Sequence, residues 1–493
     1  MNFYTNVYYS GSNILLKRNN RGVSEKVRIS YSPSLFLISS KKSEFKTIDG
    51  RNVEKIEFNN IYEQNDFKDL YKNVDNFEIH GEIGVEYQFI SDYYGGDCEY
   101  DFRNIGVLFL DIETTSENGF PSITNPTEKV ISIACKFKGK KTIFCLGEYK
   151  EKEDEEAFTY SDEQRLLRDF IEYLNVIQPD ILSGWNVRFF DIPYLVNRCK
   201  RILDDSESKK LSPWNIIKHK IVNRNGYDAE VYELVGISIL DYYELYRTFT
   251  YVNQESYKLD HIAYVELGER KMSYAEYDNI SDFYKKNFQK FVEYNMKDTE
   301  LVEKLEEKLK LMELAVALAY SAGVNYNDVF SQVKTWDVII YNDLKKRGIM
   351  IPPKKSASKD DQYAGAYVKD PIVGMHDWVV SYDVNSLYPS LIIHYNISPE
   401  TLIKKNFKGK INLKDILDRN RETDTFKCFE EAKKLNSAIA ANGTMYTIEK
   451  RGFLPELMDK MYNERKEFKG KMIDSKKKLQ EVNKELIKRG LHA

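Results

Sequence analysis

The sequence contains only five cysteines among its 493 residues, and they are scattered without a C-x-x-C pair. An odd number of separated thiols argues against both a disulfide framework and a structural zinc site. No apolar run approaches the roughly 18 to 20 residues of a membrane-spanning helix, and the N-terminus lacks the basic and then apolar order of a signal peptide. These absences predict a soluble cytosolic protein without a membrane partner.

The composition is that of a folded chain, with 42% hydrophobic and 13% aromatic residues, and the length predicts about three domains. The net charge of −4 is unevenly spread, because residues 401–493 hold 23 Lys and Arg against 14 Asp and Glu. A basic C-terminal part suits contact with phosphates, and the acidic excess upstream is what carboxylate metal sites would add. Most of these charges, taken singly, are also consistent with solvated surfaces.

The stretch WVVSYDVNSLYPSLII, residues 378–393, predicts an apolar strand that ends at Asp383 and is followed by a turn and a helix. A carboxylate at the end of a buried strand, beside the free N–H groups of a turn, can hold a divalent metal and a polyphosphate together. A strand end with a capping aspartate is the alternative interpretation.

Acidic residues also end a second apolar run, IGVLFL, which leads into DIET. The i, i+2 spacing places Asp111 and Glu113 on one face of a strand, where they would repel unless a cation lay between them. Asp191 follows the strand-like DILSGW at the start of an amphipathic helix, and Tyr294 and Asp298 share one helix face at i, i+4. Four carboxylates suit two divalent ions, and a nearby tyrosine can orient an attacking water. A solvated strand end and an ordinary buried tyrosine remain the alternatives.

These motifs resemble known families. The D-x-E pair, the string NVRFFD at residues 186–191 and Y-x-x-x-D match, in order and form, the motifs of DnaQ-like 3′→5′ exonucleases, as found in proofreading domains. DVNSLYPSLI closely resembles motif A of family B DNA polymerases, and the similarity to those of T-even phages covers nearly the whole chain. The resemblance implies the following catalytic and metal-binding residues: Asp111, Glu113, Asp191 and Asp298 with Tyr294 at the editing site, and Asp383 at the polymerising site.

The resemblance also assigns nucleotide-binding residues. It implies that Tyr388 packs under the incoming sugar as a steric gate against a ribose, with Leu387 lining the same pocket. Arg465 and Lys469 lie at i, i+4 on a basic helix and would grip the triphosphate. Without the family these two cations would be read as solvated helix charges.

Three further residues are expected to contact DNA. Phe120, in the loop SENGFP, lies where related phage enzymes carry an aromatic that stacks on the frayed primer end; a phenylalanine packed onto its own domain is the alternative. Tyr363 and Gly365 belong to YAGAYV, which resembles a family element that contacts the template strand. Residues 220–241 predict a hairpin, and the family implies that it helps to separate primer from template.

The resemblance implies an α/β and α+β multidomain protein. Alternating strand patterns at 1–103 predict a β-rich N-terminal domain, to which residues 311–354 return. Residues 104–310 are expected to form the RNase H-like, DnaQ-like exonuclease domain, a mixed sheet flanked by helices. Residues 355–453 and 454–493 would be partial palm and partial fingers.

Two family elements are missing after Asp383: the D-T-D hairpin that supplies the second catalytic carboxylate, and the K-x-x-x-N-S-x-Y-G helix. We therefore expect the N-terminal subunit of a split polymerase, completed by a separate C-terminal chain. The implied ligands are two Mg²⁺ ions per site, with Mn²⁺ as an alternative, primer–template DNA, single-stranded 3′ ends and deoxynucleotides. The implied location is the cytoplasm of an infected bacterium. A stand-alone 3′→5′ exonuclease and a non-catalytic nucleic-acid-binding regulator are the rival functions.

Overall fold

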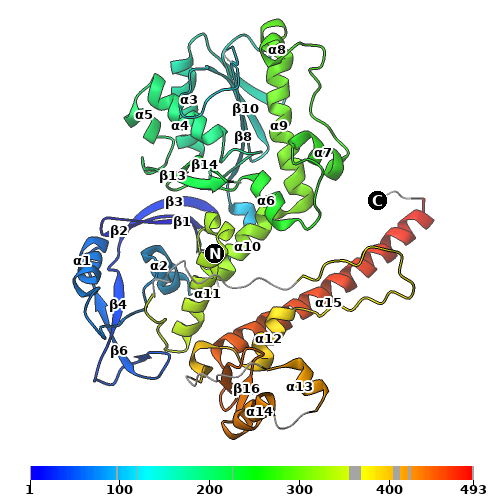
Figure 1. The fold of residues 1–493 in the computed structure, drawn as a ribbon. Coiled ribbons are helices and arrows are strands. Elements are labelled where there is room, and N and C mark those ends of the chain that lie inside the picture. Colours follow the sequence, from blue (N-terminus) through cyan, green and yellow to red (C-terminus); the bar gives the residue numbers. More distant parts are fainter. Residues whose placement is uncertain are drawn as a thin grey trace. The chain divides into compact units, whose positions relative to one another are not determined.

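A computed structural model describes residues 2–95, 98–117, 119–224, 226–354, 368–403, 411–419 and 423–490. The chain forms two compact units. The first contains Met1–Thr47 and Arg51–Lys354, and the second contains Ile48–Gly50 and Lys355–Ala493. The predicted N-terminal and exonuclease domains fall in the first unit, and the palm and fingers segments fall in the second. Figure 1 shows the elements of both units.

The N-terminal region is rich in strands, as its alternating patterns predict. An antiparallel sheet has the order β1-β2-β3, and a four-stranded sheet has the order β5-β6-β4-β7. The elements are β1 (Asn2–Ser10), β2 (Asn13–Asn20), β3 (Val23–Ser30), β4 (Ser34–Ile38), β5 (Phe45–Lys46), β6 (Asn52–Glu57), β7 (Ile79–His80), α1 (Ile61–Tyr71) and α2 (Val85–Tyr94). From Ser24 onward, exposed and partly buried residues alternate along β3, which fits an edge strand with one solvated face.

A six-stranded mixed sheet follows, with the order β11-β10-β9-β8-β12-β15. Its central strand β8 pairs antiparallel with β9 and parallel with β12, so both edges of the strand are hydrogen-bonded. The apolar residues Leu108, Phe109 and Leu110 of this strand are buried. The strands are β8 (Val107–Thr114), β9 (Val130–Phe137), β10 (Lys140–Cys145), β11 (Glu155–Thr159), β12 (Ile181–Ser183) and β15 (Ser238–Ile239). This confirms the predicted mixed sheet.

Helices cover both faces of this sheet (Figure 1). Residues of α3 and α4 pack in one core with β8, β9 and β12, whereas α8 and α9 pack on the other face against β9 and β10. The helices are α3 (Glu163–Ile177), α4 (Asp191–Ile202), α5 (Asp205–Lys209), α6 (Tyr242–Phe249), α7 (Leu259–Leu267), α8 (Ile280–Lys286) and α9 (Phe288–Leu309). The predicted hairpin is present, because β13 (Ile217–Arg224) pairs antiparallel with β14 (Tyr227–Leu234).

The chain then returns to the N-terminal strands through α10 (Leu311–Ala322), the short helix η2 (Tyr326–Phe330) and α11 (Gln332–Lys346). The hydroxyl group of Tyr320 donates to the backbone oxygen of Tyr4, and both rings lie in one hydrophobic core. A buried ion pair joins the same region to the sheet, because Lys17 Nζ lies 3.1 Å from Asp180 Oδ1. The N-terminal strands therefore share packing with the carboxylate-bearing sheet.

The described residues of the second unit form mostly helices and one short strand pair. Its elements are α12 (Leu387–Tyr395), α13 (Leu413–Leu417), α14 (Asp424–Lys434), β16 (Ser437–Ile439), β17 (Met445–Thr447), α15 (Phe453–Lys488) and the short helix η3 (Pro399–Thr401). The buried amide of Asn396 binds the backbone oxygens of Thr447 and Lys450 and the N–H of Gly452. These bonds fix the end of α12 to the start of α15. None of the described helices combines the length and the apolar character needed to cross a membrane.

One local prediction is wrong. Residues 378–382 form no strand, and Trp378 is 97% exposed. A strand needs a neighbour to pair its backbone groups, and none of the described strands pairs with this segment. The apolar side chains of Val379 and Val380 are likewise exposed.

Candidate functional site

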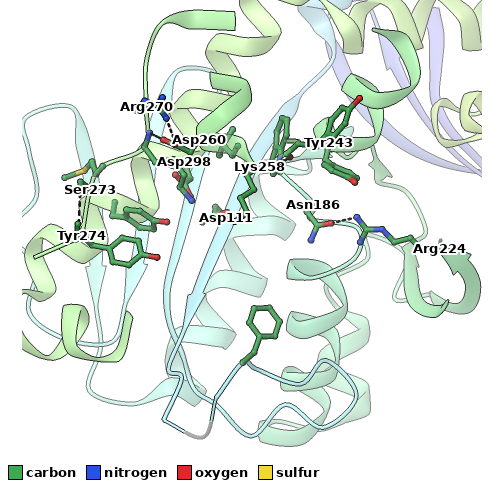
Figure 2. A pocket seen from close by; sticks show the side chains of 18 residues that line it. Asp111, Asn186, Arg224, Tyr243, Lys258, Asp260, Arg270, Ser273, Tyr274 and Asp298 are labelled. Carbon is green, nitrogen blue, oxygen red and sulfur yellow. Dashed lines mark hydrogen bonds and ion pairs between the residues drawn. The ribbon is translucent and has the colours of Figure 1, made fainter. Parts of the chain in front are cut away.

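Three carboxylates meet where the central strand approaches the long helix α9. Asp111 and Glu113 are two residues apart on β8, so their side chains lie on the same face of the sheet. Asp298 comes from α9, which packs against β8 and β9. Single carboxylate oxygens of these three residues all lie within 4.8 Å of one another. Figure 2 shows Asp111 and Asp298 facing the same cavity. The chain thus brings together residues from sequence positions almost 190 apart.

The fourth predicted carboxylate, Asp191, lies beside this cluster without belonging to it. It begins α4, is 3% exposed, and its Oδ1 accepts the backbone N–H of Ile112 at 2.9 Å. Gly184 makes this approach feasible, because a Cβ at Gly184 would lie 2.3 Å from the backbone oxygen of Leu110. The loop before α4 can therefore pack directly on β8.

Asp241 holds the loop that leads into Asp191. Its buried carboxylate accepts the backbone N–H groups of Asn186 and Arg188, and it also caps α6 through the N–H of Tyr243. Burial, assisted by the charge of Glu244, raises the pKa of Asp241 to about 7, although the three N–H groups lower it. Sequence patterns gave no reason to single out this residue.

Burial and mutual repulsion make the carboxylates hard to ionise together. The pKa of Asp111 is raised well above its usual value, first by burial and then by the charges of Asp298 and Asp191. Burial raises the pKa of Glu113 to about 8 and that of Asp191 to about 7. A divalent cation would relieve this repulsion. Asp298 Oδ1 is buried and has no hydrogen-bond partner among the described residues, which fits a metal ligand.

A lysine that the motifs did not indicate lies among the carboxylates. The ammonium group of Lys271 forms an ion pair with Asp298 and lies 4.7 Å from the centre of the Tyr294 ring. Burial lowers the pKa of Lys271, but the nearby charges of Asp298, Tyr294 and Asp111 raise it more, so the group stays charged. Lys271 lies between α7 and α8, and no local pattern relates it to these acids. Only the fold places it here.

A buried hydrogen-bond chain orients Asp111 from behind. Asn295, the residue after Tyr294 on α9, donates from Nδ2 to Asp111 Oδ2 at 2.6 Å. Its Oδ1 accepts the hydroxyl proton of Ser132 at 2.7 Å. Asn295 and Ser132 are fully buried. Both groups of the amide are therefore used, and the chain fixes the carboxylate.

Asp111 and Asp298 line a cavity of about 1000 Å³. Its wall combines the reacting groups with aromatic and basic side chains: Asp111, Phe120, Trp185, Asn186, Arg224, Tyr243, Tyr257, Lys271, Tyr294 and Asp298. Phe120 is 86% exposed, with its ring 5.5 Å from that of Phe190. Phe120 thus contacts its own domain through Phe190 and leaves most of its ring exposed. Tyr294, also predicted from the sequence, is nearly buried and faces the cavity.

The residues predicted for nucleotidyl transfer lie in the second unit and are exposed. Asp383 precedes α12, and Leu387 and Tyr388 form its first turn. Arg465 and Lys469 lie one turn apart on α15. Within the part of the chain that the structure describes, no group of acidic residues able to hold a metal includes Asp383. Tyr363 and Gly365 lie outside the described residues.

The fold thus brings together three carboxylates that could hold a metal ion on a mixed sheet. Comparisons with known proteins agree. The model for the DNA polymerase family B exonuclease domain matches residues 55–262, and the model for DNA polymerase family B matches residues 330–487. The chain belongs to DNA polymerase family B.

Phage polymerases are among its relatives. The DNA-directed DNA polymerase of Escherichia phage RB69 is 32% identical over 99% of this chain and 56% of its own length. The corresponding enzyme of Enterobacteria phage T4 is 27% identical over 99% of this chain and 55% of its own length. The DNA polymerase catalytic subunit of Elephantid herpesvirus 1 is 30% identical over 64% of this chain and 32% of its own length. The chain thus spans little more than half of the two phage relatives.

Proposed function

We propose that the first unit is a metal-dependent 3′→5′ exonuclease that edits single-stranded DNA ends. The observation that carries this proposal is the carboxylate cluster with its buried, unpaired Asp298 oxygen. Asp111, Glu113, Asp191 and Asp298 would hold two Mg²⁺ ions, or Mn²⁺ in their place. Such ions activate a water molecule and stabilise the charge that develops on a phosphodiester.

The remaining side chains would position the substrate. Tyr294 presents its phenol to the cavity beside Asp298 and can orient the attacking water. Lys271 supplies a cation that can interact with a phosphate oxygen at the same place. The exposed ring of Phe120 can stack on a terminal base, an interaction worth about 1–3 kcal/mol and indifferent to sequence. This division of roles predicts a nuclease with little sequence preference.

The test is a gel assay with a 5′-labelled single-stranded oligonucleotide, the chain alone and Mg²⁺. We expect stepwise shortening from the 3′ end, and no shortening with EDTA. Asp111→Ala should lower the rate by at least about 10³-fold, because a metal ligand is lost. The matched control is Asp205→Ala, which removes an exposed carboxylate from α5 and should leave the rate unchanged. Intact substrate with the unsubstituted chain would refute the proposal and favour a non-catalytic binding role.

For the second unit we propose half of a polymerising site. Its support is the string DVNSLYPSLI together with the family match over residues 330–487. Asp383 would bind catalytic metal, and Tyr388 would exclude a ribose with Leu387 lining the pocket. The second carboxylate would come from a separate C-terminal chain. Arg465 and Lys469 would contact the triphosphate of the incoming deoxynucleotide.

Primer extension tests this second proposal. On primed template with all four deoxynucleotides, we expect the chain alone to shorten the primer. We expect extension after addition of a C-terminal polymerase chain, and Asp383→Ala should abolish that extension but not the shortening. Extension by the chain alone would refute the need for a partner. Shortening under every condition would favour the stand-alone exonuclease.

Other aspects of the proposal follow from the same family. We propose that residues 1–103 and 311–354 form the N-terminal domain, with the exonuclease at 104–310. The segments 355–453 and 454–493 would contribute palm and fingers. Tyr363 and Gly365 are proposed template contacts, and the hairpin is proposed to separate primer from template. The phage relatives support action in an infected bacterial host.

A further inference from the structure

The connection between α7 and α8 forms one wall of the carboxylate cavity. After Gly268 ends α7 in the left-handed conformation, residues 269–273, here called the strap, run without regular secondary structure. Residues 270–273 line the cavity, and Lys271 reaches Asp298 from this wall. No backbone–backbone hydrogen bond joins the strap to another described residue. The position of the strap therefore depends on side-chain contacts.

Glu269 ties the start of the strap to α9. Its Oε2 accepts a hydrogen bond from Lys297 Nζ at 2.8 Å, and its Oε1 accepts one from Lys304 Nζ at 2.6 Å. The two lysines are seven residues apart on α9, so they lie on one face of the helix. Their hydrogen bonds lower the pKa of Glu269 to about 2, so this carboxylate is ionised at neutral pH. Because Lys297 directly precedes Asp298, Glu269 fixes the strap to the part of α9 that carries the metal-site carboxylate.

Asp260 ties the next two residues of the strap to α7. Its Oδ1 accepts the backbone N–H of Lys271 at 3.0 Å, and its Oδ2 accepts a hydrogen bond from Arg270 Nη1 at 2.8 Å. The Arg270 guanidinium also lies 4.1 Å from the centre of the Tyr264 ring on the same helix. Figure 2 shows Arg270 joined to Asp260, with Asp298 close by. Successive residues of the strap are thus bound to two different helices.

Lys271 needs a fixed backbone because its own side chain is flexible. A lysine carries a compact charge at the end of four rotatable carbons, so its ammonium group can swing over a wide range. In this structure the group lies beside Asp298 and the Tyr294 ring. A divalent ion bound by Asp298 would need the same carboxylate. The backbone position of Lys271 therefore decides how firmly the ammonium group stays at the metal site.

We propose that Glu269 and Asp260 are positioning residues that hold Lys271 at the metal site. The inference rests on the proposed exonuclease function, in which Lys271 contacts a phosphate oxygen. The ammonium group, when held there, stabilises negative charge on the phosphate but competes with the metal for Asp298. A loosened strap should therefore slow cleavage and tighten metal binding at the same time. General damage to the site would slow cleavage and weaken metal binding.

Glu269→Ala tests the proposal from outside the cavity, because Glu269 is not among the described residues that line it. Two measurements use the full chain: a calorimetric Mg²⁺ titration without DNA, and the rate of 3′-nucleotide removal at saturating Mg²⁺ and DNA. We expect the Kd for Mg²⁺ to fall about threefold and the rate to fall about threefold or more, as the loss of partly exposed ion pairs predicts. Loss of the Glu269 charge alone would weaken Mg²⁺ binding, so charge does not explain tighter binding.

A double-mutant cycle with Lys271→Met shows whether Glu269 acts through Lys271. Lys271→Met alone should slow cleavage about tenfold or more, because one charge-assisted hydrogen bond to the phosphate is lost. In that background Glu269→Ala should cause no further loss of rate and no gain in Mg²⁺ affinity. Asp260→Ala should change the rate and the affinity in the same directions as Glu269→Ala. Glu269→Gln, which keeps one acceptor for a lysine, should have a smaller effect.

Glu276→Ala is the matched control. Glu276 also forms an ion pair with a lysine of α9, Lys290, but it lies beyond the strap. The ring of Tyr274, stacked on that of Phe283 at 5.7 Å, anchors the chain between Glu276 and the strap. Glu276→Ala should therefore leave both the rate and the Mg²⁺ affinity unchanged.

Unchanged rate and Mg²⁺ affinity in Glu269→Ala would overturn the inference, as would additive losses in the cycle with Lys271→Met. Slower cleavage with weaker Mg²⁺ binding would also overturn it, because Glu269 would then support the metal site in general. Failure of the exonuclease proposal looks different: the unsubstituted chain would not shorten DNA in Mg²⁺, while the Mg²⁺ titration would still report on the strap.

Discussion

Substitution of Asn295 tests whether the buried chain behind Asp111 controls the metal site. Asn295→Ala removes the 2.6 Å bond to Asp111 and leaves the Ser132 hydroxyl without its acceptor. In the metal-free protein the raised pKa of Asp111 favours its neutral form, so the hydrogen bond from Asn295 contributes about 0.5–1.5 kcal/mol, and an unsatisfied buried hydroxyl costs about 1–3 kcal/mol. We therefore expect the metal-free protein to lose about 3 kcal/mol of unfolding free energy.

The effect on catalysis should appear in metal dependence. Groups that orient a ligand from behind typically change metal affinity or activity by about 10–100-fold. Asn295 does not line the cavity, so the KM for DNA should stay near its original value. The half-saturating Mg²⁺ concentration should rise and kcat should fall. Ser132→Ala, which leaves the bond from Asn295 to Asp111 intact, should have a smaller effect on both.

The assay is the rate of 3′-nucleotide removal across a Mg²⁺ titration, with denaturant unfolding in EDTA as the stability measurement. An unchanged Mg²⁺ requirement in Asn295→Ala would refute the positioning role, even if stability fell. A raised KM for DNA with normal Mg²⁺ dependence would mean that Asn295 acts on the substrate instead.

Three further predictions concern charge. Burial raises the pKa of Asp298 to about 6 and that of Glu113 to about 8. In the metal-free protein the protonated forms of these two acids stabilise the fold, and this stabilisation is lost as the pH rises through the two raised pKa values. Mg²⁺ should therefore raise the melting temperature more at pH 8 than at pH 6. An equal rise at both pH values would contradict the raised pKa values of Asp298 and Glu113. Lys271→Met should lower the half-saturating Mg²⁺ concentration roughly tenfold, because the ammonium group competes with the metal for Asp298 and a hydrogen bond to a charged group contributes about 1.5–3 kcal/mol. A higher half-saturating concentration in a calorimetric titration would contradict this. Lys17→Met should cost about 3–5 kcal/mol in denaturant unfolding, because it leaves Asp180 charged and buried, and a loss below 1 kcal/mol would contradict this.

Much of the candidate site could be predicted from the sequence, because the residue patterns that indicate it lie within single strands and helices. An apolar run that ends in two alternating acids predicted β8 and the shared direction of Asp111 and Glu113. The i, i+4 spacing predicted that Tyr294 and Asp298 share a face of one helix. Their side chains indeed face one cavity. The roles of these residues stay predictions until the nuclease assay is done.

Local sequence patterns gave a wrong prediction where a strand needs a pairing segment from a distant part of the chain. The apolar stretch before Asp383 reads as a strand, yet it is exposed and unpaired among the described residues. Strand propensity expresses how well a side chain fits a paired, half-buried surface, and that surface must come from another segment. Without it, alternation and β-branched residues do not produce a strand.

The sequence by itself determined the chemistry offered at each strand and helix end: paired acids on β8, an acid opening α4, and a phenol beside an acid on α9. Only the tertiary structure decided what surrounds them. It brought Lys271 to the acids and placed Asn295 and Ser132 behind Asp111. The physical reason is that periodicity is read over a few residues. Contacts between distant segments depend on which surfaces are buried together when the sheet and its helices pack.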